Sequence, residues 1–345
     1  MRKAPVVAIT LGDPSGIGPE LVAKLLVSEQ RVRHCHCVLV GDEWLWKNAQ
    51  TLTRLMHDLP VINAFEEAEH TPLGSVCFLP VSTMAEADHK VGIANKESGA
   101  SVLNVLTMCL DAAKASEIDA ICFAPLNKQA MKLAGMPFED ELHFFADQLE
   151  VEEYFCEFNT LGDIWTSRIS SHVPFKDVTQ YLSQDRIIEA TKLIHDCLIK
   201  SGVARPKIAI AALNPHGGDG GICGREEIDI IQPAVKTLQD QHYPVSGPFP
   251  ADTLFLKVRD GEFDAVVTMY HDQGQIAIKL LGFEKGVTVQ GGLPIAITTP
   301  AHGTAFDISG KNQANVNATL NAFNLACVMA QSAFKETLAT NNTEA

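Results

Sequence analysis

The feature that most constrains this chain is a regular alternation of short, apolar, β-branched runs with longer segments of helical periodicity. The continuous apolar run Ile118–Phe123 is typical of a strand buried on both faces of a parallel sheet. Such alternation predicts an α/β fold with right-handed crossovers. We expect strands at Val6–Thr10, Cys37–Val40, Ile118–Phe123 and near 164–170, 207–213 and 264–269, and helices near 18–26, 98–115, 186–202, 225–240 and 316–337.

The size and composition of the chain indicate a two-lobed globular protein. Its 345 residues are many for one compact core, and 46% of them are apolar, which supplies ample core material. The 27 basic and 42 acidic residues give a formal net charge of −15. Such a surface opposes general attraction to nucleic acid or anionic lipid, so phosphate binding needs a local pocket. No apolar stretch reaches the roughly 18 residues of a membrane span.

Cysteine usage and the first residues indicate a cytoplasmic protein. The nine cysteines are odd in number and form no C-x-x-C pair, so we expect reduced thiols. The opening run MRKAPVVAITLGD reaches turn residues without the apolar segment of a signal peptide. His34–Cys37 alternates histidine and cysteine, and we interpret it as the entry to a strand rather than as a metal site.

Three histidines lie where functional groups collect in open α/β sheets, just after the carboxyl ends of strands. His172, His216 and His271 each follow one of the last three predicted strands. A single histidine in such a place is usually a surface or hydrogen-bonding residue. Three at equivalent exits favour shared binding of a divalent cation, and three ligands with one open position are typical of a catalytic metal. The sequence alone does not establish that the three meet.

Two glycine-bearing loops are candidate binding segments. Gly12–Glu20 joins the first strand to the first helix, where glycines permit close backbone approach and a helix start suits an anion. It matches neither the dinucleotide fingerprint nor a P-loop, so a tight turn is an equal alternative. His302–Asn312 precedes the last helix, and its backbone donors, histidine and aspartate suit an adenosine and its ribose. A surface loop is the alternative there.

Three charged residues each have two interpretations. Lys279 lies eight residues after His271 in an apolar run, and is either a snorkelling helix residue or a desolvated amine suited to proton transfer. Asp252 is either a helix cap or a functional acid. Lys128 is either a solvated loop charge or a ligand contact. Taken one at a time, each residue favours the first interpretation.

In their order along the chain, these segments resemble the family of 4-hydroxythreonine-4-phosphate dehydrogenase, the NAD-dependent enzyme of pyridoxal-phosphate biosynthesis, and its paralogues. The matching segments are ITLGDPSGIGPE from Ile9, APLNK from Ala124, ALNPHGGDGG from Ala212, GPFPADTLF from Gly247, MYHDQG from Met269 and HGTAFDISGK from His302. They span nearly the whole chain, and the NPH and YHDQG segments are specific to the family. The glycine-rich start and the last loop also resemble the β-decarboxylating dehydrogenases of isopropylmalate and isocitrate.

The resemblance implies an architecture and an assembly. The subunit would be a two-lobed α/β protein like isocitrate and isopropylmalate dehydrogenases, with mostly parallel sheets and helices on both faces. Residues 1–135 with about 286–345 would form the cofactor-side lobe. Residues of about 136–285 would form the lobe for metal, substrate and dimerisation. A homodimer would complete each site near the subunit interface.

The resemblance also implies two bound groups. One is a divalent cation, either zinc or else magnesium, manganese or cobalt, held by His172, His216 and His271. The other is NAD, with NADP left open. It would lie against His302, Gly303, Thr304, Ala305, Asp307 and Asn315.

The remaining site residues implied by the resemblance fall into two groups. The candidates for catalysis are Lys279, Asp252 and Asp272. Those for substrate binding that keep the family pattern are Gly12, Asp13 and Lys128.

The chain departs from the family pattern at other positions expected to touch substrate. The family's Gly-His-Thr-Glu is here Asp140–His143, which places Glu141 in the motif and a histidine, His143, at its end. The family's substrate-binding asparagine corresponds to Thr288, and its phosphate-gripping arginine to Ile297. Isoleucine makes no charge-assisted bond to phosphate. Retained metal and cofactor segments beside altered substrate segments indicate the same chemistry on a changed ligand.

These features together predict an NAD- and metal-dependent dehydrogenase that oxidises a small hydroxy acid, with decarboxylation following. The expected substrate is 4-hydroxythreonine 4-phosphate or a close phosphorylated analogue such as 4-phospho-D-threonate or erythronate. One alternative is a nonphosphorylated substrate such as a carboxylated cis-dihydrodiol. The others are a metal-dependent hydrolase or lyase without redox chemistry, and a catalytically silent dimer.

Overall fold

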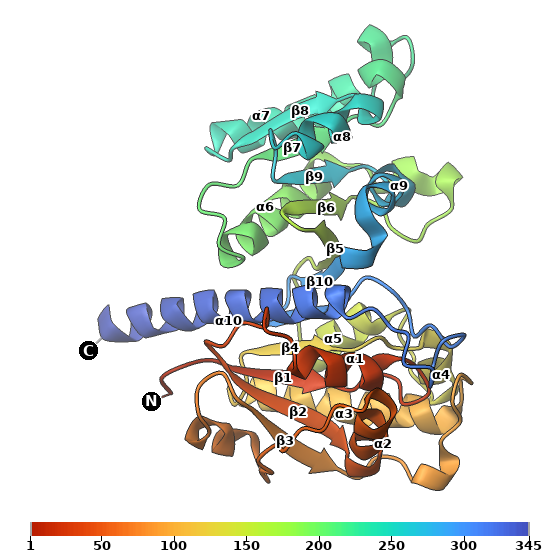
Figure 1. The fold of residues 1–345 in the computed structure, drawn as a ribbon. Helices are drawn as coiled ribbons and strands as arrows, with labels where there is room; N and C mark the ends of the chain where they lie inside the picture. The colour runs from red at the N-terminus through yellow and green to blue at the C-terminus, as the bar shows by residue number, and fades with distance from the viewer. Residues whose placement is uncertain (1, 344–345) are drawn as a thin grey trace. The chain divides into compact units, whose positions relative to one another are not determined.

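The structure is a computed structural model that describes residues 2–343. Its contacts divide the chain into two compact units (Figure 1). The first unit comprises the residues up to Glu152 together with those from Val287 onward, and the second unit is Glu153–Gly286. The second unit is therefore a continuous segment inserted into the sequence of the first.

The strands of the first unit lie in the order β3-β2-β1-β4-β11-β10. Neighbouring strands are parallel except β10 and β11, which are antiparallel. Every residue of β1 and β2 is buried, so both faces at the centre of this sheet are covered. The strands are β1 (Val6–Thr10), β2 (His36–Asp42), β3 (Val76–Val81), β4 (Ala120–Phe123), β10 (Val287–Gly291) and β11 (Ala296–Pro300).

Helices of the first unit form two groups that both contact its sheet. The long helix α10 packs on β1, β4, β10 and β11 and touches α1, whereas α3 packs on β1 and with α4 and α5 (Figure 1). These helices are α1 (Gly18–Leu26), α2 (Glu43–Thr53), α3 (Lys96–Lys114), α4 (Lys128–Leu133), α5 (Glu141–Gln148) and α10 (Asn317–Thr343).

The observed division differs from the expected one at its first boundary. The segment 136–152, expected in the second lobe, belongs to the first unit. Phe145 of α5 is fully buried, and its ring lies 5.6 Å from that of Phe123 at the end of β4. Burial of this aromatic pair joins α5 to the first sheet.

The strands of the second unit lie in the order β5-β6-β9-β7-β8, and only the β5–β6 pair is antiparallel. All residues of β7 and β9 are buried, which leaves polar groups to the strand ends. Helices α6 and α9 both contact β6 and β9, while α7 packs on β8 and α8 on β7. The elements are β5 (Cys156–Leu161), β6 (Ile164–Arg168), β7 (Ile208–Ala211), β8 (Val245–Phe249), β9 (Ala265–Thr268), α6 (Gln184–Lys200), α7 (Gln232–Asp240), α8 (Ala251–Arg259) and α9 (His271–Gly282).

The predicted α/β class, with mostly parallel strands and alternating helices, is confirmed. The His34–Cys37 run leads into β2 as predicted. The helix expected near 225–240 differs in detail: Glu227–Ile231 is π-helical, and the regular helix α7 begins only at Gln232.

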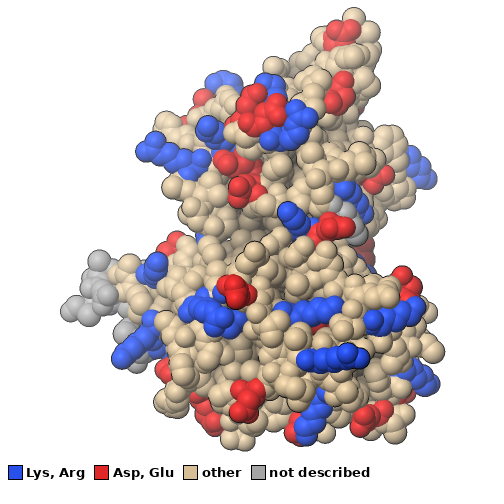
Figure 2. Space-filling view, in the orientation of Figure 1, with Lys and Arg blue, Asp and Glu red and all other residues tan. Residues whose placement is uncertain are grey.

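Three properties of the described part of the chain bear on its environment. The cysteines form no disulfide in residues 2–343, and most of them are buried. In the same range no helix combines the length and the apolar character needed to cross a membrane. On the face shown in Figure 2, basic and acidic side chains are interspersed over each unit rather than gathered by sign.

Candidate active site

Two of the predicted metal ligands lie close together in the second unit. Strands β6 and β9 are parallel neighbours, so their carboxyl ends open side by side. His172 follows β6, and His271 begins α9 directly after β9. Their ring centroids are 5.6 Å apart with the planes tilted by 43°. Together with Asp272 they line a cleft of about 630 Å³.

Asp272 orients the ring of His271. The Nδ1 atom of His271 lies 2.7 Å from a carboxylate oxygen of Asp272, so the imidazole donates its Nδ1 proton there. This tautomer leaves Nε2 as the lone-pair nitrogen, which is the usual arrangement of a metal-binding histidine. The geometry gives Asp272, expected as a catalytic group, an orienting role.

His216 lies in an adjoining cleft of about 1180 Å³ that Asp252 also lines. Phe175, Val178 and Tyr270 line both clefts, so the two spaces share a wall. Within residues 2–343, however, no three His, Cys, Asp or Glu side chains form a group able to hold a metal ion. One chain therefore brings together two of the three expected ligands and leaves the third nearby.

Lys279 and Asp252 each had two predicted roles, and the environment of each residue excludes one of them. Lys279 is exposed on α9, so within this chain it is a solvated helix residue and not a desolvated amine. Asp252 does not cap α8: the N-cap position is Pro250, and Asp252 lies exposed in the first helical turn at the edge of the larger cleft. An acid at that place is available to a ligand.

The glycine-rich turn after β1 uses its N–H groups internally. Ser15 N–H and Gly16 N–H donate to the side chain and the carbonyl oxygen of Asp13, at 2.7 and 3.0 Å. Ile17 N–H donates to the carbonyl oxygen of Thr304 at 3.1 Å. An anion would have to displace these bonds, so the geometry favours the tight-turn interpretation over an anion cradle. Gly12, with a φ of +70°, supports this turn.

The turn and the loop before α10 are joined by polar contacts between residues almost 300 positions apart. The buried carboxylate of Glu20 accepts the Ala314 N–H and the Lys24 ammonium, each at 2.7 Å. Ser309 Oγ donates to the Ser15 carbonyl oxygen at 2.9 Å. These bonds hold the loop in a defined conformation on the first unit.

The expected NAD-binding residues divide into anchors and accessible groups. Thr304 is buried, and its side chain packs so closely on Gly16 that a Cβ there would lie 2.9 Å away. Gly303, Asp307 and Asn315 are exposed and His302 is half-buried. Ala305 has a φ of +42°, which turns the chain between buried Thr304 and exposed Asp307. The accessible residues present the polar groups that a nucleotide requires.

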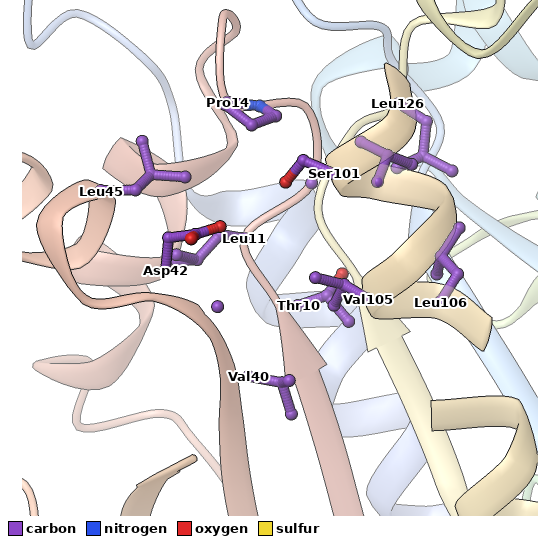
Figure 3. A pocket seen from close by; sticks show the side chains of 13 residues that line it. Thr10, Leu11, Pro14, Val40, Asp42, Leu45, Ser101, Val105, Leu106 and Leu126 are labelled. Atoms are coloured by element: carbon purple, nitrogen blue, oxygen red, sulfur yellow. The ribbon is translucent and has the colours of Figure 1, made fainter. Parts of the chain in front are cut away.

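The usual dinucleotide position for this strand order involves an acid, Asp42, that already has partners within the chain. Parallel strands in the order β3-β2-β1-β4 place a dinucleotide crevice between the ends of β1 and β4, with an acid after the second strand to bind ribose. Figure 3 shows the pocket nearest to that place, at the ends of β1 and β2, where Leu11 and Leu45 lie near Asp42 and Val105 of α3 lies near Thr10. The Asp42 carboxylate already accepts the N–H and hydroxyl of Thr83, at 2.9 and 2.5 Å. A ribose would compete with both bonds.

Expected substrate residues gather at the starts of α4 and α5. Lys128 Nζ lies 3.5 Å from a carboxylate oxygen of Glu141. Asp140 accepts the backbone N–H of His143 at 3.0 Å and lies 2.7 Å from its Nδ1. Burial opposes ionisation of Asp140, but the bonds from His143 outweigh it and hold the pKa of this carboxyl below its ordinary value. The cluster carries more negative than positive charge.

The other two expected substrate positions are inside the first sheet. Thr288 on β10 is buried, and Ile297 on β11 is fully buried opposite Ile121 of β4. Ile297 was expected to mark a substrate contact, but strand pairing and the packing of α10 on β11 direct it into the core. The side chain contributes to the fold in this chain.

Two polar residues near the clefts were not among the predicted site residues. Gln273 lines the larger cleft two residues after His271. Glu227 is almost completely buried beneath the loop that carries His216. Gln273 lies inside the YHDQG motif, which was a usable signal, whereas nothing in the pattern around Glu227 distinguishes it from a surface acid.

Comparisons with known proteins identify the family to which the chain belongs. Residues 33–326 match the family described as "Pyridoxal phosphate biosynthetic protein PdxA". A Pseudomonas aeruginosa protein provisionally named 4-hydroxythreonine-4-phosphate dehydrogenase 2 is 49% identical over 330 residues, which cover 94% of this chain and 97% of that protein.

Two solved structures share the fold over most of their length. Crystalline 4-hydroxythreonine-4-phosphate dehydrogenase from Klebsiella pneumoniae is 30% identical with a TM-score of 0.83, covering 96% of this chain and 99% of its own. A terephthalate 1,2-cis-dihydrodiol dehydrogenase from Burkholderia xenovorans is 26% identical with a TM-score of 0.67, covering 94% of this chain and 98% of its own.

Asp13 generates a prediction about stability and pH. Its side chain is fully buried, and among the described residues its Oδ2 atom has no hydrogen-bond partner. Burial raises the pKa of this carboxyl from 3.8 to about 6, against the opposing effect of the Ser15 N–H. Since the folded-state pKa exceeds the unfolded one, protonation favours folding, and this contribution is lost as the pH rises through that window.

We expect Asp13→Asn, which cannot ionise, to gain stability relative to the wild type by up to about 3 kcal/mol as the pH rises from about 4 to about 7.5. Urea unfolding of both proteins at several pH values measures the difference. Asp147→Asn, at an exposed aspartate of the same unit, serves as the control. A constant difference between Asp13→Asn and wild type would contradict the prediction.

Proposed function

Because this chain belongs to the PdxA family of pyridoxal phosphate biosynthetic proteins, we propose that it is an NAD-dependent dehydrogenase that oxidises a hydroxyl group of a small hydroxy acid. The observation that carries the proposal is the pair His172 and His271 at adjacent strand exits, with His216 in the adjoining cleft. The substrate we propose first is 4-hydroxythreonine 4-phosphate, or a close analogue such as 4-phospho-D-threonate or erythronate. The names of the similar dehydrogenases support a phosphorylated hydroxy acid.

The donor set fits a divalent cation. Imidazoles suit zinc and other late transition metals, and His271 is already oriented by Asp272 for binding through its second nitrogen. We propose that three histidines, His172, His216 and His271, bind the ion. We further propose that the three come together only when a second copy of the chain packs against the first. Magnesium, manganese and cobalt remain alternatives to zinc.

The residues around His302 fit a nicotinamide dinucleotide. The half-buried His302 and the exposed Gly303, Asp307 and Asn315 offer polar contacts, while buried Thr304 keeps the loop in place. The bonds from Thr83 that occupy the Asp42 carboxylate support this location over the one usual for the same strand order. We propose NAD rather than NADP, with NADP as the alternative.

A homodimer would explain an apolar surface on the second unit. Ile276 and Leu280 of α9 are 58% and 83% exposed, and Phe175 beside the clefts is 74% exposed. Exposed apolar side chains of this size, clustered near a candidate site, mark interaction surfaces. Lys279 lies between Ile276 and Leu280 in sequence, so a second copy packed on this helix would desolvate its amine. We place this dimer in the cytoplasm.

In the proposed reaction the chain binds the hydroxy acid and moves one proton. When bound, the cation polarises the substrate hydroxyl and NAD accepts the hydride. Lys279 Nζ, at the proposed dimer interface, takes the hydroxyl proton. Asp252 orients the substrate in the larger cleft, and Asp272 keeps His271 in its binding tautomer. Oxidation of the hydroxyl on the carbon β to the carboxylate yields a β-keto acid, which then loses carbon dioxide.

One observation favours a second candidate substrate class. Asp140 and Glu141 surround Lys128 with negative charge, and Ile297 offers no charged group to a phosphate. A nonphosphorylated ligand such as a carboxylated cis-dihydrodiol suits such a site better. The solved dihydrodiol dehydrogenase shares the fold. A metal-dependent hydrolase or lyase, or a silent dimer, would leave the accessible residues of the His302 loop without a role.

The choice of substrate is tested by NAD reduction at 340 nm with the metal-loaded protein. We expect turnover of 4-hydroxythreonine 4-phosphate or of a phosphorylated threonate or erythronate. Unphosphorylated diol acids of matched size are the comparison. Turnover of the diol acids alone would replace the first substrate class by the second, and failure to bind NAD in calorimetry would contradict the dehydrogenase proposal.

The histidine assignment is tested by substitution. We expect His172→Ala and His216→Ala each to lower bound metal and to reduce turnover by about 100-fold or more, because the cation supplies several kcal/mol of charge stabilisation. Metal content is measured by mass spectrometry after gel filtration. His70→Ala, at an exposed histidine of the first unit, should retain both properties. Unchanged metal content in the first two variants would show the assignment to be wrong.

The proposed dimer is tested on α9. We expect Leu280→Asp to raise the dissociation constant of the dimer by at least about tenfold, because a carboxylate would be buried at the interface. Analytical ultracentrifugation over a range of concentrations measures this constant. Leu73→Asp, at an exposed leucine of the first unit, is the matched control. Equal dissociation constants for the two variants would exclude this helix from the interface.

A further inference from the structure

The amide of Gln273 connects two strand exits that carry candidate metal ligands. Its Oε1 accepts the Met269 N–H at 2.7 Å, and its Nε2 donates to the Ala212 carbonyl oxygen at 2.7 Å. Met269 lies two residues before His271, and Ala212 lies four residues before His216. One side chain thereby spans 61 positions of sequence between the ends of β9 and β7.

The same network reaches the third exit. The backbone N–H and the hydroxyl of Ser170 both donate to the Met269 carbonyl oxygen, at 3.2 and 2.9 Å. Ser170 is buried two residues before His172. A continuous hydrogen-bonded path therefore runs from Ser170 through Met269 and Gln273 to Ala212. The backbone ahead of each of the three histidines is part of it.

Beyond Ala212, the side chain of Glu227 binds the backbone of the segment that leads to His216. Its buried carboxylate accepts the N–H groups of Leu213 and Asn214 at 2.8 and 2.7 Å, and the Asn214 amide at 2.9 Å. The chain then turns through six consecutive residues with positive φ, from His216 to Gly221. Gly218 allows the close approach, since a Cβ there would lie 2.7 Å from the Glu227 carboxylate.

We infer that Gln273 is a positioning residue that sets the spacing of His216 relative to His271 for cation binding. The inference rests on the proposed metal-dependent function. Capping of α9 is the competing explanation, because Gln273 is the third residue of that helix. Its side-chain carbonyl oxygen accepts the N–H of Met269, which precedes the helix. The bond to Ala212 has no part in capping, and only this bond joins the two exits.

The variant Gln273→Glu separates the two roles. A glutamate still accepts the Met269 N–H and so preserves the cap, but it has no proton to donate to the Ala212 carbonyl oxygen. Two acceptors then face each other in a partly buried place, which drives the exits of β7 and β9 apart. The variant Gln232→Glu makes the same chemical change at an exposed position of the same unit.

Titration of the full-length proteins with Co²⁺ tests the inference. Calorimetry measures its affinity, and visible absorption of the bound ion reports its coordination. We expect Gln273→Glu to bind Co²⁺ about 10- to 100-fold more weakly than wild type with an altered visible spectrum, as for other residues that orient ligands. Its melting temperature should stay within a few degrees of wild type, and Gln232→Glu should match wild type in every measurement.

Unchanged affinity and spectrum in Gln273→Glu would overturn the inference while leaving the proposed metal site intact. A wild-type protein that binds no Co²⁺ would instead overturn the metal site, and the inference with it. Should Gln273→Glu fail to fold, Gln273→Met replaces it, because methionine keeps the side-chain length and cannot donate to the Ala212 carbonyl oxygen. An affinity lowered several-fold supports the inference in that case, and an unchanged one overturns it.

Discussion

The candidate site depends on one pairing constraint: β6, β9 and β7 are adjacent and parallel, so their carboxyl ends open along the same edge of a sheet. All residues of β7 and β9 are buried, and the three candidate ligand histidines lie beyond the ends of the strands. His172, His216 and His271 come from three loops at that edge. Register between the strands, together with the path through Gln273, brings segments about 100 residues apart into neighbouring clefts.

The first unit meets a different constraint, because its strand order offers two places for a dinucleotide. At the first place, the Asp42 carboxylate already accepts hydrogen bonds from Thr83. The loop after His302 is held by the bond from Ala314 to Glu20 and by the bond from Ser309 to Ser15. Gly303 and Asp307 of this loop remain exposed. The first unit thus combines the strand order of a common nucleotide-binding fold with an exposed polar loop elsewhere on the same unit.

The sequence predicted the class of fold well because its signal is local. Apolar runs such as Ile118–Phe123 mark central strands without reference to anything distant, and the three histidines follow such runs directly. The site was predicted less completely, since its details depend on distant partners. The direction of Ile297 follows from pairing with β4, and the burial of Glu227 follows from a loop with positive φ that it supports. Neither environment can be predicted from the residues adjacent in sequence.

The unequal construction of the two units has a consequence for biosynthesis. The second unit is a continuous segment, so all of its strands have left the ribosome before the last part of the first unit is made. The first unit needs β10, β11 and α10, and Glu20 near its beginning binds the distant Ala314 as well as the local Lys24. Domains generally fold as whole units during synthesis. The inserted segment is therefore free to fold early, while the N-terminal strands wait for the final fifth of the chain before their sheet closes.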